Sequence, residues 1–322
     1  MAPSINVILG AASIGDSAAS KFPKFDTPEQ VNSLLNLFYE RGYRHIDTAR
    51  GYAPGAPGTS EPRLGAVDAG KRFTIDTKAM AAGDHPHSKD KIIENVDVSV
   101  KELRIPQVNV YYLHMPDRTT PLEEAVAGMD AAYKAGKIKQ FGVSNHTPDE
   151  VEQLVKISEE KGYIKPTVYQ GQYNAIVRGG EKDLFPVLRK HNIAFYAYSP
   201  AGGGFFAGNH KGSNTRFDRS LRVGEVYSNY YCNPQLEEAF QRASAAGDKH
   251  GISGHAAALR WTAYHSILDP KFGDAIILGA STVDQMKQNL DILDEGPLPE
   301  EVAAAVGAVY SYVGDGEIKP YM

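Results

Sequence analysis

The chain has 322 residues, of which 42% are hydrophobic and 23% charged, so it can bury the core of one large domain. A formal net charge of −5 without a basic run argues against a nucleic-acid partner, and no apolar run approaches the roughly 20 residues that a membrane span needs. The single cysteine, Cys232, excludes an intramolecular disulfide and suits a reducing, cytoplasmic location. The start of the sequence lacks the basic segment of a signal peptide.

Strand-like and helix-like segments alternate along the chain. The first predicted strand, 5–9, is followed by a helix over 28–41, which begins at Thr27-Pro28 and carries apolar residues at helical spacing. Further strand–helix pairs are predicted at 44–47 with 60–69, 73–77 with 88–103, 108–114 with 121–135, 139–143 with 147–160, and 167–169 with 183–191.

The alternation changes after the seventh predicted strand, 193–198. The polar segment 205–233 is too long for an ordinary connection, which favours a lid or clamp. Helices at 234–250 and 253–265, a strand at 275–278, a helix to 293 and a tail helix at 299–312 complete the chain.

Eight strand–helix units predict a single domain over 1–322, folded as a closed (β/α)₈ TIM barrel with a long late loop and a C-terminal tail helix. The Gly-x-Gly-x-x-Gly pattern of an open dinucleotide-binding sheet does not follow the first strand, where the sequence is Leu9-Gly10-Ala11-Ala12.

Four ionisable side chains follow successive predicted strands. Asp47 ends the second strand, Tyr52 lies in the next loop, Lys78 follows the third strand and His114 the fourth. Because the carboxyl ends of barrel strands lie on one face, we expect these side chains to meet. Asp47 would then keep Lys78 charged, the ammonium would lower the pKa of the Tyr52 phenol, and a neutral His114 could hydrogen-bond a carbonyl oxygen.

This set of residue types predicts a proton donor for a carbonyl group rather than a metal site, since Tyr and Lys are poor zinc ligands and no His-x-x-x-His pair is present. The alternative is that Lys78 and Asp47 form only a structural salt bridge and that His114 is a core histidine.

Reduction of a carbonyl also needs a hydride source, and the later strand ends suit a nicotinamide nucleotide. Ser144, Asn145 and Gln170 can hydrogen-bond a carboxamide, and Tyr198 can stack on a flat ring.

Backbone suited to phosphates follows strands seven and eight, where barrels commonly bind them. Ser199-Pro200 leads into the glycine run 201–204, in which Gly202 and Gly203 permit close approach of a pyrophosphate, although simple loop flexibility would also explain these glycines. Gly279 to Ser281 opens a helix whose free N–H groups favour a phosphate.

The chain resembles the aldo-keto reductases over essentially its whole length. HIDTARGY, TKAM and YYLHMPD resemble the segments that carry the family's Asp, Tyr, Lys and His, and GVSNH and VYQGQYN resemble its nicotinamide-binding segments. GDAIILGASTVDQMKQNL and FYAYSP resemble the aflatoxin-aldehyde reductase branch.

The resemblance implies a catalytic tetrad of Asp47, Tyr52, Lys78 and His114, with Tyr52 as the general acid, and NADPH as the cofactor. It implies that the adenosine end of the cofactor contacts Ser281, Gln285, Gln288 and Asn289, with Arg216 contributed by the long segment.

Two positions depart from the branch. Ser199 stands where the branch usually has Asn, and Tyr227 is followed by Ser228-Asn229-Tyr230-Tyr231, without the arginines that hold the carboxylate of succinic semialdehyde. His114, Tyr227, Tyr230 and Tyr231 are therefore the expected substrate contacts, and a neutral aromatic or bulky carbonyl is the expected substrate.

The predicted function is NADPH-dependent reduction of an aldehyde or ketone, a small-molecule carbonyl substrate, to an alcohol in the cytoplasm, with a homodimer as one possible assembly. Two alternatives stay open. One is a cofactor-binding regulatory subunit, because potassium-channel β subunits share this fold and tetrad. The other is a barrel lyase that forms a Schiff base at Lys78.

Overall fold

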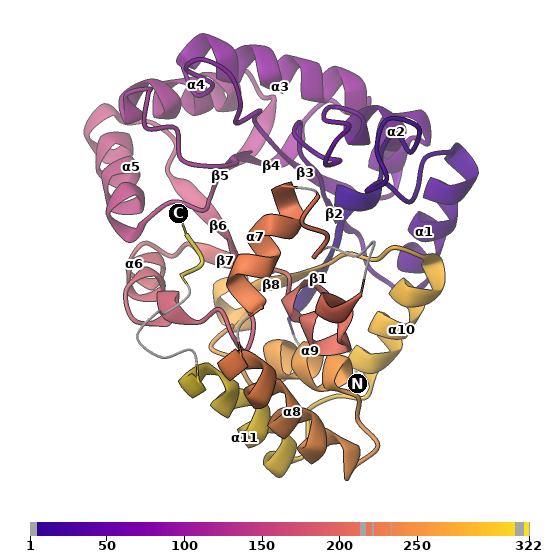
Figure 1. Cartoon of the computed structure of the whole chain (residues 1–322). Helices are drawn as coiled ribbons and strands as arrows, with labels where there is room; N and C mark the ends of the chain where they lie inside the picture. The colour runs from indigo at the N-terminus through magenta and orange to yellow at the C-terminus, as the bar shows by residue number, and fades with distance from the viewer. Residues whose placement is uncertain (1–4, 213–216, 221, 233, 313–318, 322) are drawn as a thin grey trace.

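The computed structural model describes residues 5–212, 217–220, 222–232, 234–312 and 319–321, and its strands form a closed parallel barrel in chain order (Figure 1). The strands are β1 (Asn6–Gly10), β2 (His45–Asp47), β3 (Thr74–Lys78), β4 (Val108–Leu113), β5 (Ile138–Ser144), β6 (Pro166–Gln172), β7 (Ala194–Tyr198) and β8 (Ala275–Leu278).

Helices alternate with the strands and surround the barrel in Figure 1, except for α7, which crosses its middle. Their bounds are α1 (Pro28–Glu40), α2 (Ser60–Ala66), α3 (Lys89–Leu103), α4 (Leu122–Lys134), α5 (Pro148–Lys161), α6 (Leu184–Lys190), α7 (Arg222–Tyr231), α8 (Pro234–Asp248), α9 (Gly254–Tyr264), α10 (Val283–Asp294) and α11 (Glu300–Ala308). The predicted barrel and tail helix are thereby confirmed. In the described part of the chain, none of these helices is long and apolar enough to span a bilayer.

Local sequence signals set the starts of α1 and α5. Thr27 and Thr147 each accept a hydrogen bond from a backbone N–H in the first turn, and a side chain three residues later bonds back to complete a capping box. A proline follows each threonine, where its fixed φ favours the helix and its missing N–H leaves no bond unmade.

The core has two layers because side chains alternate between the faces of each strand. The smaller layer fills the inside of the barrel, and the larger one lies between the barrel and the helices. The inner layer consists of Ile8, Val110, Tyr112, Val168, Ala194, Tyr196, Ala275 and Ile277.

Strand register brings the predicted strand-end residues together. Asp47 pairs with Asp76 across β2 and β3, and Lys78 pairs with Tyr112 across β3 and β4. Because Tyr112 belongs to the inner layer, we infer that Lys78 also faces the inside of the barrel.

Strand β6 is longer than the sequence predicted. Gly171 and Gln172 still pair with Ala197 and Tyr198 of β7, so Gln172 ends the strand and Gln170 lies within it. The predicted strand, 167–169, therefore stops three residues short of the observed end of β6.

The late segment 205–233, for which a lid or clamp but no helix was predicted, contains helix α7. Gly224, Tyr227, Ser228 and Tyr231 are buried, which is the spacing of one helical face. A glycine and a serine in that buried stripe weaken its apolar signal in the sequence. Arg216, the predicted clamp from this segment, lies outside the described residues.

Candidate active site

Asp47, Tyr52 and Lys78 are in direct contact at the mouth of the barrel. The Lys78 Nζ donates to both carboxylate oxygens of Asp47 at 2.7 Å and to the Tyr52 hydroxyl at 3.1 Å. The Tyr52 hydroxyl in turn donates to Asp47 Oδ2 at 3.2 Å. Asp47 and Lys78 are only 1% and 0% exposed, so the interactions form in a nearly dry environment. The prediction that these three side chains lie in contact is therefore confirmed.

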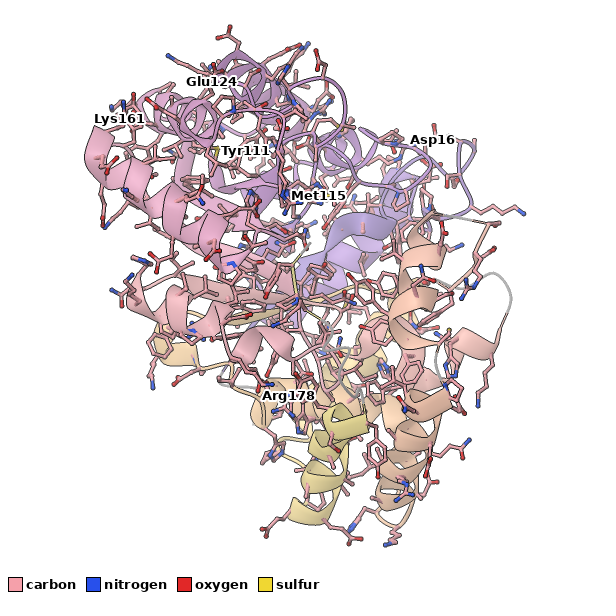
Figure 2. The ribbon with its side chains drawn as sticks, turned by 60° about the vertical axis from the view of Figure 1, so that its left-hand side comes forward. Asp16, Tyr111, Met115, Glu124, Lys161 and Arg178 are labelled. Carbon is pink, nitrogen blue, oxygen red and sulfur yellow. The ribbon has the colours of Figure 1, made fainter. Side chains whose placement is uncertain are left out.

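His114 lies beside Tyr52, with the two rings edge to face and their centroids 5.8 Å apart. It follows β4, as does its neighbour Met115, which Figure 2 labels. Burial, followed by the charges of Lys78 and His87, lowers the pKa of His114 to about 3. The imidazole is therefore neutral at pH 7 and can donate one N–H to a substrate oxygen.

The expectation of a lowered pKa for Tyr52 is wrong, because the opposing effects outweigh any lowering by Lys78. Burial raises the pKa of the Tyr52 phenol well above its usual value, and the Asp47 carboxylate raises it further. Lys78 is bonded to that same carboxylate, which offsets the positive charge felt by the phenol. Tyr52 is therefore fully protonated at neutral pH, which is the state that a general acid requires.

The residues expected to hold a nicotinamide are connected to this cluster. Asn145 has a left-handed φ of 62° and donates to the His114 carbonyl and to the Ser144 hydroxyl, both at 3.0 Å. The Tyr198 hydroxyl donates to Asn145 Oδ1 at 3.0 Å. Gln170 donates to Asp47 Oδ1 at 2.8 Å, so one of its amide hydrogens supports the carboxylate.

The loop after β7 is hydrogen-bonded to Tyr227 of the late segment and to Thr262 of α9. The Ser199 hydroxyl lies 2.6 Å from the Tyr227 hydroxyl, and the Pro200 carbonyl accepts from Thr262 at 2.8 Å. Gly202 and Gly203 both have positive φ, and the Tyr227 ring lies so close to Gly203 that a Cβ there would clash with it. These glycines therefore serve both the turn and the packing of Tyr227.

The residues expected at the adenosine end divide into two groups. Ser281, Gln285 and Gln288 are exposed near the start of α10, as is Gly279, which was expected beside a phosphate. The Ser281 N–H donates to Gln285 Oε1 at 2.7 Å. Asn289 is instead buried, with its Oδ1 2.8 Å from Nε2 of His255.

The three tyrosines of α7 lie in different environments. Tyr231 is fully buried, and its hydroxyl accepts from Gln172 at 2.7 Å and from Asn174 at 2.9 Å. Tyr227 is also buried, whereas Tyr230 is half-buried. Of the three, Tyr230 therefore offers the most accessible ring surface to a substrate.

Sequence reasoning missed Gln172, Asn174 and Glu61. The first two lie at and just beyond the end of β6, where a longer strand with period-two alternation would have indicated them. Glu61 is fully buried in the first turn of α2, and only its contacts reveal its place.

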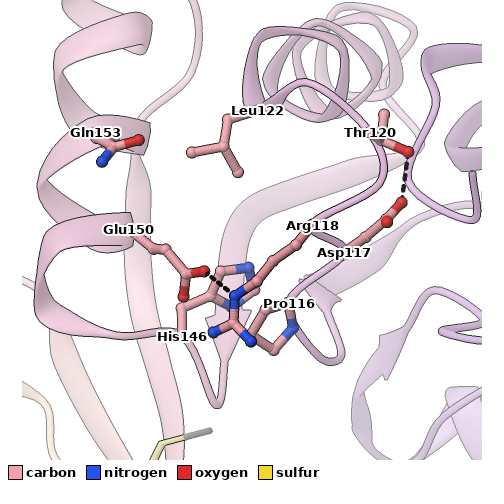
Figure 3. Close-up of a pocket in the computed structure, with 8 residues that line it drawn as sticks. All are labelled: Pro116, Asp117, Arg118, Thr120, Leu122, His146, Glu150 and Gln153. Carbon is pink, nitrogen blue, oxygen red and sulfur yellow. Dashed lines mark hydrogen bonds and ion pairs between the residues drawn. The ribbon is translucent and has the colours of Figure 1, made fainter.

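A separate hollow of about 290 Å³ lies between the loop after β4 and helix α5 (Figure 3). Figure 3 shows Arg118 paired with Glu150, and Thr120 bonded to Asp117. Asp47, Tyr52, Lys78 and His114 are not among its lining residues, which are Pro116, Asp117, Arg118, Thr120, Leu122, His146, Glu150 and Gln153. Arg118 and Asp117 already bond to Glu150 and Thr120 there, and the hollow contains none of the four candidate catalytic side chains at the barrel mouth.

Comparison with known proteins gives concordant matches across the chain. The sequence pattern of the Aldo/keto reductase family matches residues 6–311. Oxidoreductase sirO of Leptosphaeria maculans is 36% identical over 312 residues, which cover 95% of this chain and 94% of that protein.

Two human proteins are similar over comparable lengths. Aldo-keto reductase family 7 member A3 is 35% identical over 323 residues, covering 95% of this chain and 94% of that protein. Aflatoxin B1 aldehyde reductase member 2 is 34% identical over 331 residues, covering 97% of this chain and 88% of that protein.

Proposed function

Because the chain belongs to the aldo/keto reductase family, we propose that it reduces an aldehyde or ketone to an alcohol with NADPH. The observation that carries this proposal is the Tyr52 hydroxyl, held between Lys78 Nζ at 3.1 Å and Asp47 Oδ2 at 3.2 Å, with a neutral His114 beside it. This arrangement keeps a phenolic proton next to a buried cation, as protonation of a developing alkoxide requires.

When bound, the nicotinamide supplies a hydride to the carbonyl carbon. Tyr52 gives its proton to the carbonyl oxygen, and Lys78 stabilises the phenolate that remains. His114 donates a hydrogen bond to the same oxygen and so orients the carbonyl. Asp47 holds the lysine, and Gln170 holds Asp47, so the donor is positioned before the substrate arrives.

The residues at the mouth fit such a cofactor. Tyr198 is partly exposed, and its hydroxyl is fixed by Asn145, which prepares a ring face for stacking. Exposed Ser281 and Gln285 near the start of α10 suit the phosphate of NADPH, and resemblance to the branch supports NADPH over NADH. Fluorescence titration with both cofactors tests this preference, and equal dissociation constants would reject it.

A Schiff-base reaction at Lys78 is disfavoured by the same contacts. Burial lowers the pKa of Lys78, but its hydrogen bonds to Asp47, to the Thr48 carbonyl and to Tyr52 favour the protonated form and leave no free lone pair for attack on a carbonyl. Borohydride trapping with an aldehyde tests the alternative, and a covalent adduct at Lys78 would revive it.

We further propose that neutral aromatic carbonyls are better substrates than acidic aldehydes. Tyr230 offers an accessible ring, and the sequence after Tyr227 lacks an arginine to pair with a carboxylate. The ratio of kcat/KM for 4-nitrobenzaldehyde and succinic semialdehyde decides this. A preference for the acid that Arg222→Ala abolishes would reject the proposal.

The primary experiment is turnover of the purified protein with NADPH and a panel of aldehydes and ketones, with alcohol formation measured directly. We expect reduction of at least the aromatic aldehydes. NADPH binding without turnover on any carbonyl would instead support a cofactor-binding regulatory subunit.

A further inference from the structure

We infer that Glu61 is a positioning residue that sets the distance between Tyr52 and Lys78. Its carboxylate joins two segments: Oε2 accepts from Arg50 Nη1 at 2.7 Å, and Oε1 accepts from the Thr77 hydroxyl at 2.6 Å. Arg50 lies in the loop just before Tyr52, and Thr77 immediately precedes Lys78. One buried side chain therefore holds both the strand that carries the lysine and the loop that carries the phenol.

Glu61 is itself firmly held. It is 0% exposed and lies in the first turn of α2. Farther along that helix, Gly65 packs against the Glu102 backbone carbonyl at the end of α3, with no room for a Cβ. This close approach fixes α2 against the outer helical layer. The Glu61 carboxylate is thus rigidly held, and the Tyr52 loop is bonded to it through Arg50.

The loop needs such an attachment because it is irregular. Backbone bonds run from the Arg50 N–H to the Lys78 carbonyl at 3.1 Å and from the Gly58 N–H to the Tyr52 carbonyl at 3.0 Å. These bonds restrain the backbone, and the pair of Glu61 with Arg50 adds a side-chain restraint near the phenol. The Glu61 charge also raises the pKa of Lys78, which opposes the larger lowering by burial and favours the ammonium.

The test rests on the proposed function and uses Glu61→Gln, which keeps the size of the side chain but presents an amide to Arg50. A shift of about 1 Å in a reacting group can lower a rate about 10²-fold, so we expect kcat to fall by about 10- to 100-fold. We expect the KM for NADPH to stay unchanged, because Glu61 contacts the Tyr52 side of the mouth. A crystal structure should show the Tyr52 hydroxyl farther from Lys78 Nζ than 3.1 Å.

The matched control is Asp274→Asn. Asp274 is also buried and paired with an arginine, Arg189, at 3.0 Å, but it precedes β8 at the opposite end of the barrel. We expect this variant to lose stability while kcat is retained at temperatures where it stays folded. Wild-type kcat in Glu61→Gln, or an equal loss of kcat in Asp274→Asn, would overturn the inference.

Thr77→Val provides a second test that removes only one bond to the carboxylate, and it decides the question if Glu61→Gln does not fold. We expect a smaller fall in kcat, again with an unchanged KM for NADPH, and wild-type kcat would count against the inference. Absence of turnover in the wild type would reject the proposed function instead. In that case, the Tyr52–Lys78 distance in the variant crystal structures decides the role of Glu61.

Discussion

At the residue scale, the Tyr52 hydroxyl has two partners, Lys78 as donor and Asp47 as acceptor. Tyr52→Phe removes both bonds and the acidic proton but leaves the ring beside His114. We expect NADPH affinity to be unchanged and turnover to fall by about 10²–10⁴-fold, the usual contribution of a positioned general acid. Fluorescence titration and the steady-state rate with 4-nitrobenzaldehyde measure the two effects. Near-wild-type turnover would remove Tyr52 from its proposed role.

Lys78→Met should reduce both activity and stability. It leaves the buried Asp47 carboxylate without its cation, which typically costs about 3–5 kcal/mol of unfolding free energy. Loss of the cation should also raise the pKa of Tyr52 and shift the alkaline limb of alcohol oxidation to higher pH.

The matched double variant Asp47→Asn with Lys78→Met separates these effects. Removing both charges should restore much of the stability measured by denaturant unfolding, but not the activity. An unchanged alkaline limb in the single variant would show that Lys78 does not tune Tyr52.

At the scale of elements, α7 is attached to the barrel through its tyrosine hydroxyls. Tyr231→Phe keeps the buried ring but leaves the Gln172 and Asn174 amides without the oxygen to which they donate. Leaving buried donors unpaired costs about 1–3 kcal/mol, so we expect α7 to open more often. Hydrogen exchange of the α7 amides measures the opening.

The control for this prediction is Tyr230→Phe, which changes a half-buried hydroxyl on the same helix. It should leave amide protection in α7 near the wild-type level. Equal protection in both variants would mean that the two hydrogen bonds do not hold the helix.

At the scale of the whole molecule, buried neutral histidines make stability depend on pH. Burial, with a smaller contribution from nearby His146 and against the opposing charge of Asp117, lowers the pKa of His87 from 6.5 to about 4. Between these values the unfolded chain binds a proton that the native protein does not, so stability falls as the pH decreases from 6.5 toward 4.

His87→Leu tests this dependence. The loss attributable to His87 is about 2 kcal/mol at pH 5, because the unfolded histidine is then largely protonated. The variant should therefore lose about 2 kcal/mol less than the wild type between pH 7.5 and pH 5 in urea unfolding. Parallel stability curves for the two proteins would contradict the assignment.

The sequence by itself determined the barrel and the meeting of Asp47, Tyr52 and Lys78. Strand and helix periods are local properties, and the parallel order of the strands follows from their alternation with helices. Because parallel strands end on one face of a barrel, residues at strand ends could be assigned to one site before any contact was known. The cofactor and substrate roles stay predictions, to be decided by the experiments above.

Only the tertiary structure decided how the site is supported. Gln170 donates to Asp47 from 123 positions away, Glu61 joins Arg50 to Thr77, and Tyr231 of α7 accepts from Gln172 at the end of β6. The raised pKa of Tyr52 likewise depends on burial and on the distance to a carboxylate. Such contacts join residues from different units of the barrel, and no local period encodes which side chains will be neighbours after the sheet closes.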